Sequence, residues 1–256
     1  MVKATLRLIN KLYKYLSICA LLIGCANTAD VIKIDTQNGY NSERVESILA
    51  HYHHVYNVFK KNHNVLILPK KHLKFINGLL GKTTEGFNEI VIYDSNQSFY
   101  FSSPGGSLLV SKAFAKNYFQ NEQILRAFLI ENHIRAKKNF YSRKYIYPTG
   151  LATVEDLAQV MIMSIRKKDL LNQQCVEHLI KLGFSPTSYL DYLQHRNKDN
   201  HLVSNLLNGT VYGLEEERHL KTYLIEKHKE LFIRNLEVDL SSKQFYKFKK
   251  YIGKVL

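Results

Sequence analysis

The residues best suited to chemistry lie in one short segment, Glu131-Asn132-His133-Ile134-Arg135. Carboxylate and imidazole groups bind metal ions and transfer protons, so Glu131 and His133 could do either. Glu131 and Arg135 are four residues apart, which makes them neighbours on a helix and predicts an ion pair. The segment therefore has two possible uses, one in metal chemistry and one in a structural ion pair.

A cluster of three histidines, His51, His53 and His54, is a second candidate for metal binding. On a helix His51 and His54 share a face and His53 points elsewhere, and two histidines alone make a weak site. We interpret the cluster as a polar helix face. Cys175 has no neighbouring cysteine, so we expect a buried small hydrophobic residue. The chain has no Gly-x-Ser-x-Gly elbow, Walker loop or dinucleotide-binding fingerprint.

The elements that must position these residues follow from hydrophobic periodicity. Apolar residues at helical spacing predict a helix over 42–60. Short runs of β-branched and aromatic residues then predict strands near 65–68, 89–93, 98–102 and 108–111. Beyond residue 112, the same periodicity predicts that the long segments are helices. The expected fold class is α+β, mainly helical with a small sheet, in a single domain over 42–256.

Several boundary signals support the helical half of the chain. Asn121 is a predicted N-cap, and Thr153 with Asp156 forms a predicted capping box ahead of a helix that continues to Ser164. A further helix should run to Leu182 and end at Gly183. The remaining helices are expected over 187–195, 214–233 and 242–252. No segment after residue 25 is long and apolar enough to cross a membrane.

Four segments carry a resemblance to a known family. They are residues 98–112 (SFYFSSPGGSLLVSK), 121–129 (NEQILRAFL), 182–186 (LGFSP) and 215–218 (EEER). In this order and spacing they resemble the HtpX, BepA and CAAX-prenyl-protease family of zinc metallopeptidases, over residues 42–235. The resemblance implies a zincin-like metallopeptidase fold. It also implies an edge strand after the Pro-Gly-Gly turn, formed by Ser107, Leu108, Leu109 and Val110, which would accept extended polypeptide by backbone pairing.

The residues that would make such an enzyme active are absent. The positions of the family's H-E-x-x-H motif are Glu131, Asn132 and Arg135, the third-ligand position is Leu170, and the His-Pro pair falls on Tyr212-Gly213. An amide cannot take a proton from water, and a guanidinium repels a metal cation. We therefore expect a catalytically inactive member with no cofactor. The alternative is an active zinc metalloendopeptidase whose displaced ligands include Glu131, His133 and a distant histidine.

The N-terminus indicates export. Lys3, Arg7, Lys11 and Lys14 precede an apolar run over 15–23 that is too short for a membrane-spanning helix. Residues 22–25 (LIGC) resemble the bacterial lipobox. This predicts a lipoprotein signal peptide over 1–24, acylation of Cys25, a tether over 25–41 and attachment to the membrane. Ala26 after the cysteine favours an outer-membrane lipoprotein that faces the periplasm.

The charge would by itself suggest nucleic acid as a partner. The 256 residues contain 36 basic and 22 acidic residues and carry a formal net charge of +14. Four of the basic residues belong to the signal, and export removes the protein from nucleic acid. We expect a membrane partner through Cys25 and unfolded or extended polypeptide, but no nucleic acid. Nucleic-acid binding remains the alternative if residues 1–24 are not an export signal.

Overall fold

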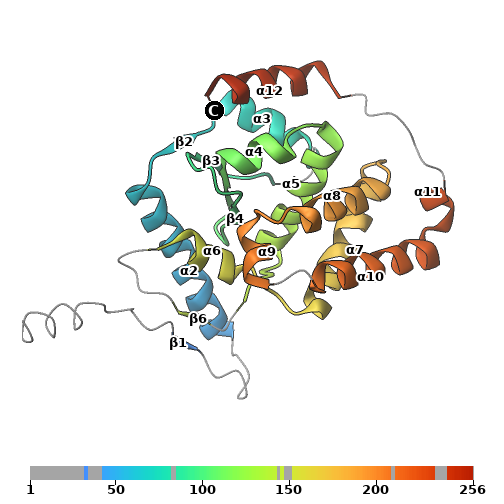
Figure 1. Ribbon diagram of the computed structural model, residues 1–256, viewed down its shortest axis with the longest axis horizontal. Helices are drawn as coiled ribbons and strands as arrows, with labels where there is room; N and C mark the ends of the chain where they lie inside the picture. The colour runs from blue at the N-terminus through green and yellow to red at the C-terminus, as the bar shows by residue number, and fades with distance from the viewer. Residues whose placement is uncertain are drawn as a thin grey trace, which may run out of the picture.

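The computed structural model describes residues 32–33, 42–81, 85–142, 145–146, 152–208, 211–233 and 241–255. Its helices surround a four-stranded mixed sheet, so the expected α+β class is confirmed (Figure 1). The predicted signal peptide, Cys25 and all of the tether except Ile32 and Lys33 lie outside the described residues. Across the described part of the chain, no helix has the length and apolar character that crossing a bilayer requires.

The main sheet has the strand order β2-β3-β5-β4. Its strands are β2 (Val65–Ile67), β3 (Glu89–Tyr93), β4 (Tyr100–Ser102) and β5 (Ser107–Ser111), which confirms the four predicted strands with small changes at their ends. β5 runs parallel to β3 and antiparallel to β4, and β2 is antiparallel to β3. The Pro104-Gly105-Gly106 turn joins β4 to β5, and Gly106 has a φ of 78°. Glycine adopts this left-handed conformation without steric cost.

Eleven helices are described besides these strands. They are α2 (Ser42–Asn62), α3 (Lys70–Gly78), α4 (Lys112–Tyr118), α5 (Glu122–Lys137), α6 (Val154–Val160), α7 (Ile165–Lys181), α8 (Thr187–Lys198), α9 (Val203–Asn208), α10 (Val211–Lys227), α11 (Lys229–Ile233) and α12 (Lys243–Val255). A second small sheet pairs β1 (Ile32–Lys33) with β6 (Tyr145–Ile146). Helices α3 and α9 and this small sheet were not predicted from the sequence.

The capping signals explain where the central helices begin. The Asn121 side chain accepts a hydrogen bond from the Ile124 amide, and Thr153 and Asp156 form the reciprocal capping box. The helix that follows Thr153 ends at Val160, however, and a new helix begins at Ile165, so the prediction of one helix to Ser164 is wrong. The left-handed Gly183 follows α7, as expected for a helix C-terminus.

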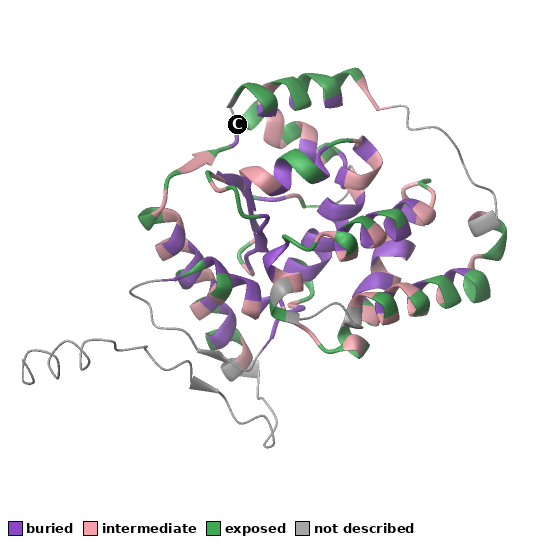
Figure 2. Cartoon of the chain, viewed as in Figure 1, coloured by how far each residue is buried: buried purple, intermediate pink, exposed green. Residues whose placement is uncertain are grey.

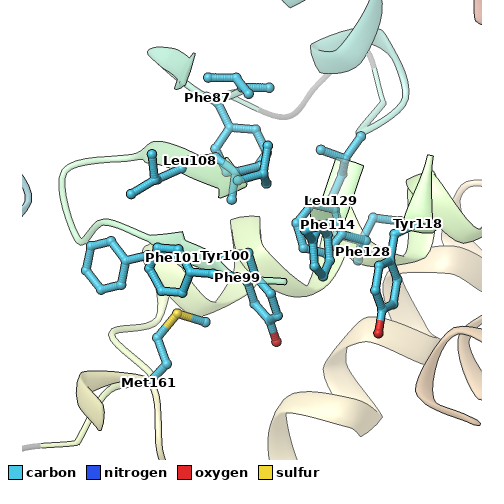
Figure 3. Close-up of a cluster of buried hydrophobic side chains, with 14 of the residues drawn as sticks. Phe87, Phe99, Tyr100, Phe101, Leu108, Phe114, Tyr118, Phe128, Leu129 and Met161 are labelled. Atoms are coloured by element: carbon cyan, nitrogen blue, oxygen red, sulfur yellow. The ribbon is translucent and has the colours of Figure 1, made fainter. Parts of the chain in front are cut away.

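Helix α5 is the centre of the molecule. Twelve of its 16 residues are buried, and both α7 and α8 pack against it (Figure 2). Phe128 lies in an aromatic cluster with Phe114 and with Tyr100, whose ring centroid is 5.3 Å away (Figure 3). Because α5 is covered on almost every side, its polar residues must find partners on the surrounding helices.

Candidate functional site

The two ionic residues of the α5 motif pair with each other. Arg135 Nη2 donates a hydrogen bond to Glu131 Oε1 at 2.7 Å, which confirms the predicted i,i+4 ion pair. Glu131 is fully buried and Arg135 is 4% exposed. A buried charge requires partners for all its polar atoms, so the second oxygen of Glu131 needs another donor.

That donor comes from α8. Arg196 Nη1 donates to Glu131 Oε2 at 2.9 Å, and Arg196 Nη2 donates to Glu216 Oε1 of α10 at 2.7 Å. Lys168 Nζ of α7 lies 3.4 Å from Glu216 Oε2. A continuous chain of charges thus crosses four neighbouring helices, and it consists of Arg135, Glu131, Arg196, Glu216 and Lys168. We call these five residues the ion network.

Further hydrogen bonds fix the ends of the ion network. Asn172 Nδ2 donates to Glu216 Oε1 at 3.0 Å, and Tyr189 in turn donates to Asn172 at 2.7 Å. Arg135 Nη1 donates to the backbone carbonyls of Phe140 and Met161. Burial alone would raise the pKa of Glu216, but the charges of Arg196 and Lys168 outweigh it and lower the pKa to about 2. Glu216 is therefore ionised at neutral pH.

The other positions at which the resemblance would place catalytic or metal-binding residues have structural roles or lie elsewhere. Asn132 is buried, and its Nδ2 donates to the Phe128 carbonyl at 2.9 Å. Leu170, expected at the third-ligand position, is 48% exposed and does not line the site, whereas Lys168 and Leu171 of the same helix do. One residue along a helix is a rotation of about 100°, so a one-position error moves a side chain to another face. Tyr212 is the second residue of α10, but its side chain is outside the described part of the chain.

His133 points to a different side of α5 from the ion network. Its ring packs against Phe87 with centroids 5.9 Å apart, and its Nε2 is buried without a hydrogen-bond partner. Burial, assisted by the charge of Lys137, lowers the pKa of His133 to about 4, so the imidazole is neutral at pH 7. It lines an open groove of about 1100 Å³ together with Phe87, Asn88, Lys137 and the Pro104-Gly105-Gly106 turn. We call this the turn groove.

The remaining candidate ligands do not gather around one point. Among the residues that the structure describes, no group of three or more His, Cys, Asp or Glu side chains could hold a metal ion. His53 Nδ1 lies 2.7 Å from Ser103 Oγ, while His51 is half-buried and His54 is exposed on α2. Cys175 is fully buried and unpaired, as predicted, and burial raises the pKa of its thiol.

The prediction that Ser107, Leu108, Leu109 and Val110 form an edge strand is wrong. These residues belong to β5, which pairs with β3 on one side and with β4 on the other, and all five residues of β5 are buried. The physical reason is the crossover from β3, which places β5 in the middle of the sheet. β4 is the outer strand on this side, and α5 and α6 pack against it.

Arg196 was not among the site residues predicted from the sequence. Arg196 follows Tyr189, Tyr192 and Leu193 at helical spacing, so it continues the apolar stripe of α8. A charged residue on an apolar stripe indicates a buried charge that needs partners, and this signal was available. The partners of Arg196, Glu131 on α5 and Glu216 on α10, could not be inferred, because sequence spacing gives no distance between separate helices.

The C-terminal helix α12 is rich in lysine and has one face exposed to solvent. On α12 the exposed residues include Lys243, Lys247, Lys250 and Lys254, whereas the buried ones are Phe245, Phe248 and Ile252. This arrangement is that of a solvated amphipathic helix.

No protein-family model matches the chain, and no curated protein matches it either.

Proposed function

We propose that this chain is a membrane-anchored lipoprotein with a metallopeptidase-like, zincin-type fold that lacks catalytic activity. In this proposal it binds unfolded or extended polypeptide in the cell envelope, at the outer membrane facing the periplasm, and takes part in protein quality control. It needs no cofactor and has no nucleic-acid partner.

The ion network is the observation that carries the loss of activity. Arg135 and Arg196 each donate to one oxygen of Glu131, so both oxygens of this carboxylate are engaged by cations. A divalent metal there would have to displace two arginines and sit beside their charges. His133 faces the turn groove, away from Glu131, so the two residues named for displaced zinc ligation do not converge.

The turn groove supports the binding of polypeptide. It contains a buried, neutral imidazole whose Nε2 has no partner, next to the backbone of a glycine-rich turn. Buried polar atoms normally have a hydrogen-bond partner, and peptide N–H and C=O groups could supply one. Phe87 and Pro104 add apolar surface for side chains of the bound segment.

The absence of peptidase activity and the binding of polypeptide can both be tested on the full chain purified in a neutral detergent. We expect substoichiometric zinc, no chelator-sensitive cleavage of casein, and micromolar binding of fluorescein-labelled, denatured casein by fluorescence anisotropy. His133→Leu should weaken this binding several-fold because it removes the unpartnered Nε2. The control His201→Leu alters an exposed histidine outside the groove and should leave binding unchanged. Stoichiometric zinc with chelator-sensitive cleavage would instead favour the active metallopeptidase.

The anchoring prediction concerns Cys25. Cells that express the chain and are fed labelled palmitate should yield labelled protein that fractionates with the membranes, because acyl chains at Cys25 hold it there. The Cys25→Ala variant should lose the label and the membrane association. Cys19→Ala lies in the same signal segment and should behave as the wild type. Unlabelled wild-type protein in the cytosol would contradict the proposed anchor and would reopen nucleic-acid binding.

A further inference from the structure

The ion network borders a pocket whose polar lining carries an excess of positive charge. The pocket encloses about 740 Å³, part of it open to solvent, and is lined by residues of β4 and of the helices α5 to α10. Its charged lining residues are Arg135, Lys168, Arg196, Glu131 and Glu216. Three cations face two carboxylates, so these groups together carry one uncompensated positive charge.

Among the charged groups of the lining, free hydrogen-bond donors also outnumber free acceptors. Each oxygen of Glu131 and Glu216 already accepts from a cation of the ion network. Arg135 Nε has no hydrogen-bond partner but is too deeply buried to meet a ligand, whereas the Lys168 ammonium contacts Glu216 and, with three N–H groups, has further donors for an acceptor in the pocket. Burial of an unmatched donor and an unmatched charge is unfavourable, so the pocket is complementary to an acceptor that carries negative charge.

The size of the excess charge selects the kind of anion. We infer that this pocket binds a single carboxylate group, from the C-terminus of a polypeptide or from a small organic acid. One negative charge neutralises the lining, whereas a phosphate dianion would leave an excess of negative charge beside Glu131 and Glu216. The Lys168 ammonium can donate to the ligand carboxylate, and Phe99, Tyr100 and Leu171 offer an apolar wall for the rest of the ligand.

Lys168 is the best residue for a test because it lies at the accessible end of the ion network. Its side chain is 17% exposed, compared with 4% for Arg135 and 8% for Arg196. Lys168→Gln removes the excess charge and leaves the hydrogen bonds between the two arginines and the two glutamates in place. Lys181→Gln is the matched control, because Lys181 is an exposed lysine on the same helix and does not line the pocket.

The test is isothermal titration calorimetry of the full chain in a zwitterionic detergent. Three ligands are compared: N-acetyl-trialanine, which has a free C-terminal carboxylate, the C-terminal amide of the same peptide, and succinate. We expect one of the two acids to bind and the amide not to bind; the acid that binds more tightly identifies the source of the carboxylate. Lys168→Gln should weaken that binding about tenfold or more, because a charge-assisted contact is lost, and Lys181→Gln should not.

Circular dichroism checks that both variants are folded. The inference fails if neither acid binds, if the amide binds as tightly as the acid, or if Lys168→Gln has no effect. It stands independently of polypeptide capture by the turn groove.

Discussion

Glu131→Gln is expected to destabilise the protein by about 3–5 kcal/mol, because it leaves buried arginines without a charged partner. Arg135 loses the only carboxylate that it contacts at hydrogen-bond distance among the described residues, and Arg196 keeps Glu216 alone. Neither guanidinium can lose its proton to escape the penalty. Urea unfolding followed by far-UV circular dichroism at pH 7 measures the loss, and the slope with urea should stay unchanged.

Two further variants separate a charge effect from a general sensitivity to substitution. Asp94→Asn breaks an exposed pair, in which Lys112 Nζ lies 3.9 Å from Asp94 Oδ1, and should change stability by less than about 0.5 kcal/mol. In Glu131→Met with Arg135→Met, the stranded guanidinium is removed together with its partner, so the double variant should be more stable than Glu131→Gln. A loss below about 1 kcal/mol in Glu131→Gln would show that water reaches these charges.

Local signals predicted much of the fold. The caps at Asn121 and Thr153, the four strands of the sheet and the long helices are properties of short windows, in which hydrophobic period and capping chemistry act directly. The order of the strands is a different kind of property. The edge-strand prediction for Ser107–Val110 failed because a crossover from β3 places β5 inside the sheet, and neither strand's own sequence encodes its neighbours.

The same distinction explains what could be predicted of the candidate site. The Glu131–Arg135 ion pair follows from spacing on one helix and was predicted, and so was the burial of Cys175. The bridge through Arg196 to Glu216 joins three helices, and it depends on packing distances that residues far apart in sequence do not reveal. An arginine on the apolar stripe of α8 nevertheless indicated that a buried acidic partner had to exist.

Arg196→Met is expected to cost about 3 kcal/mol or more at pH 7, because Arg196 makes two charge-assisted hydrogen bonds, one to each buried carboxylate. The effect should depend on pH. In the folded protein the pKa of Glu216 is about 2, against an ordinary value of 4.5, because Arg196 and Lys168 overcome the effect of burial. A carboxylate with a lowered pKa stabilises the fold above its unfolded pKa, and this stability is lost as the pH falls toward the folded pKa.

The stability linked to Glu216 amounts to about 3 kcal/mol, since each pKa unit corresponds to about 1.4 kcal/mol. Arg196→Met removes the stronger of the two charges that hold the pKa down, so the pKa should rise and less stability should remain to be lost in acid. The difference in unfolding free energy between wild type and variant should therefore be largest above about pH 5 and should narrow toward pH 3. Urea unfolding at these two pH values measures it. Arg218→Met, at an exposed arginine of α10, should show no such narrowing. A difference that is the same at both pH values would mean that Arg196 stabilises the fold by packing alone and does not hold Glu216 ionised.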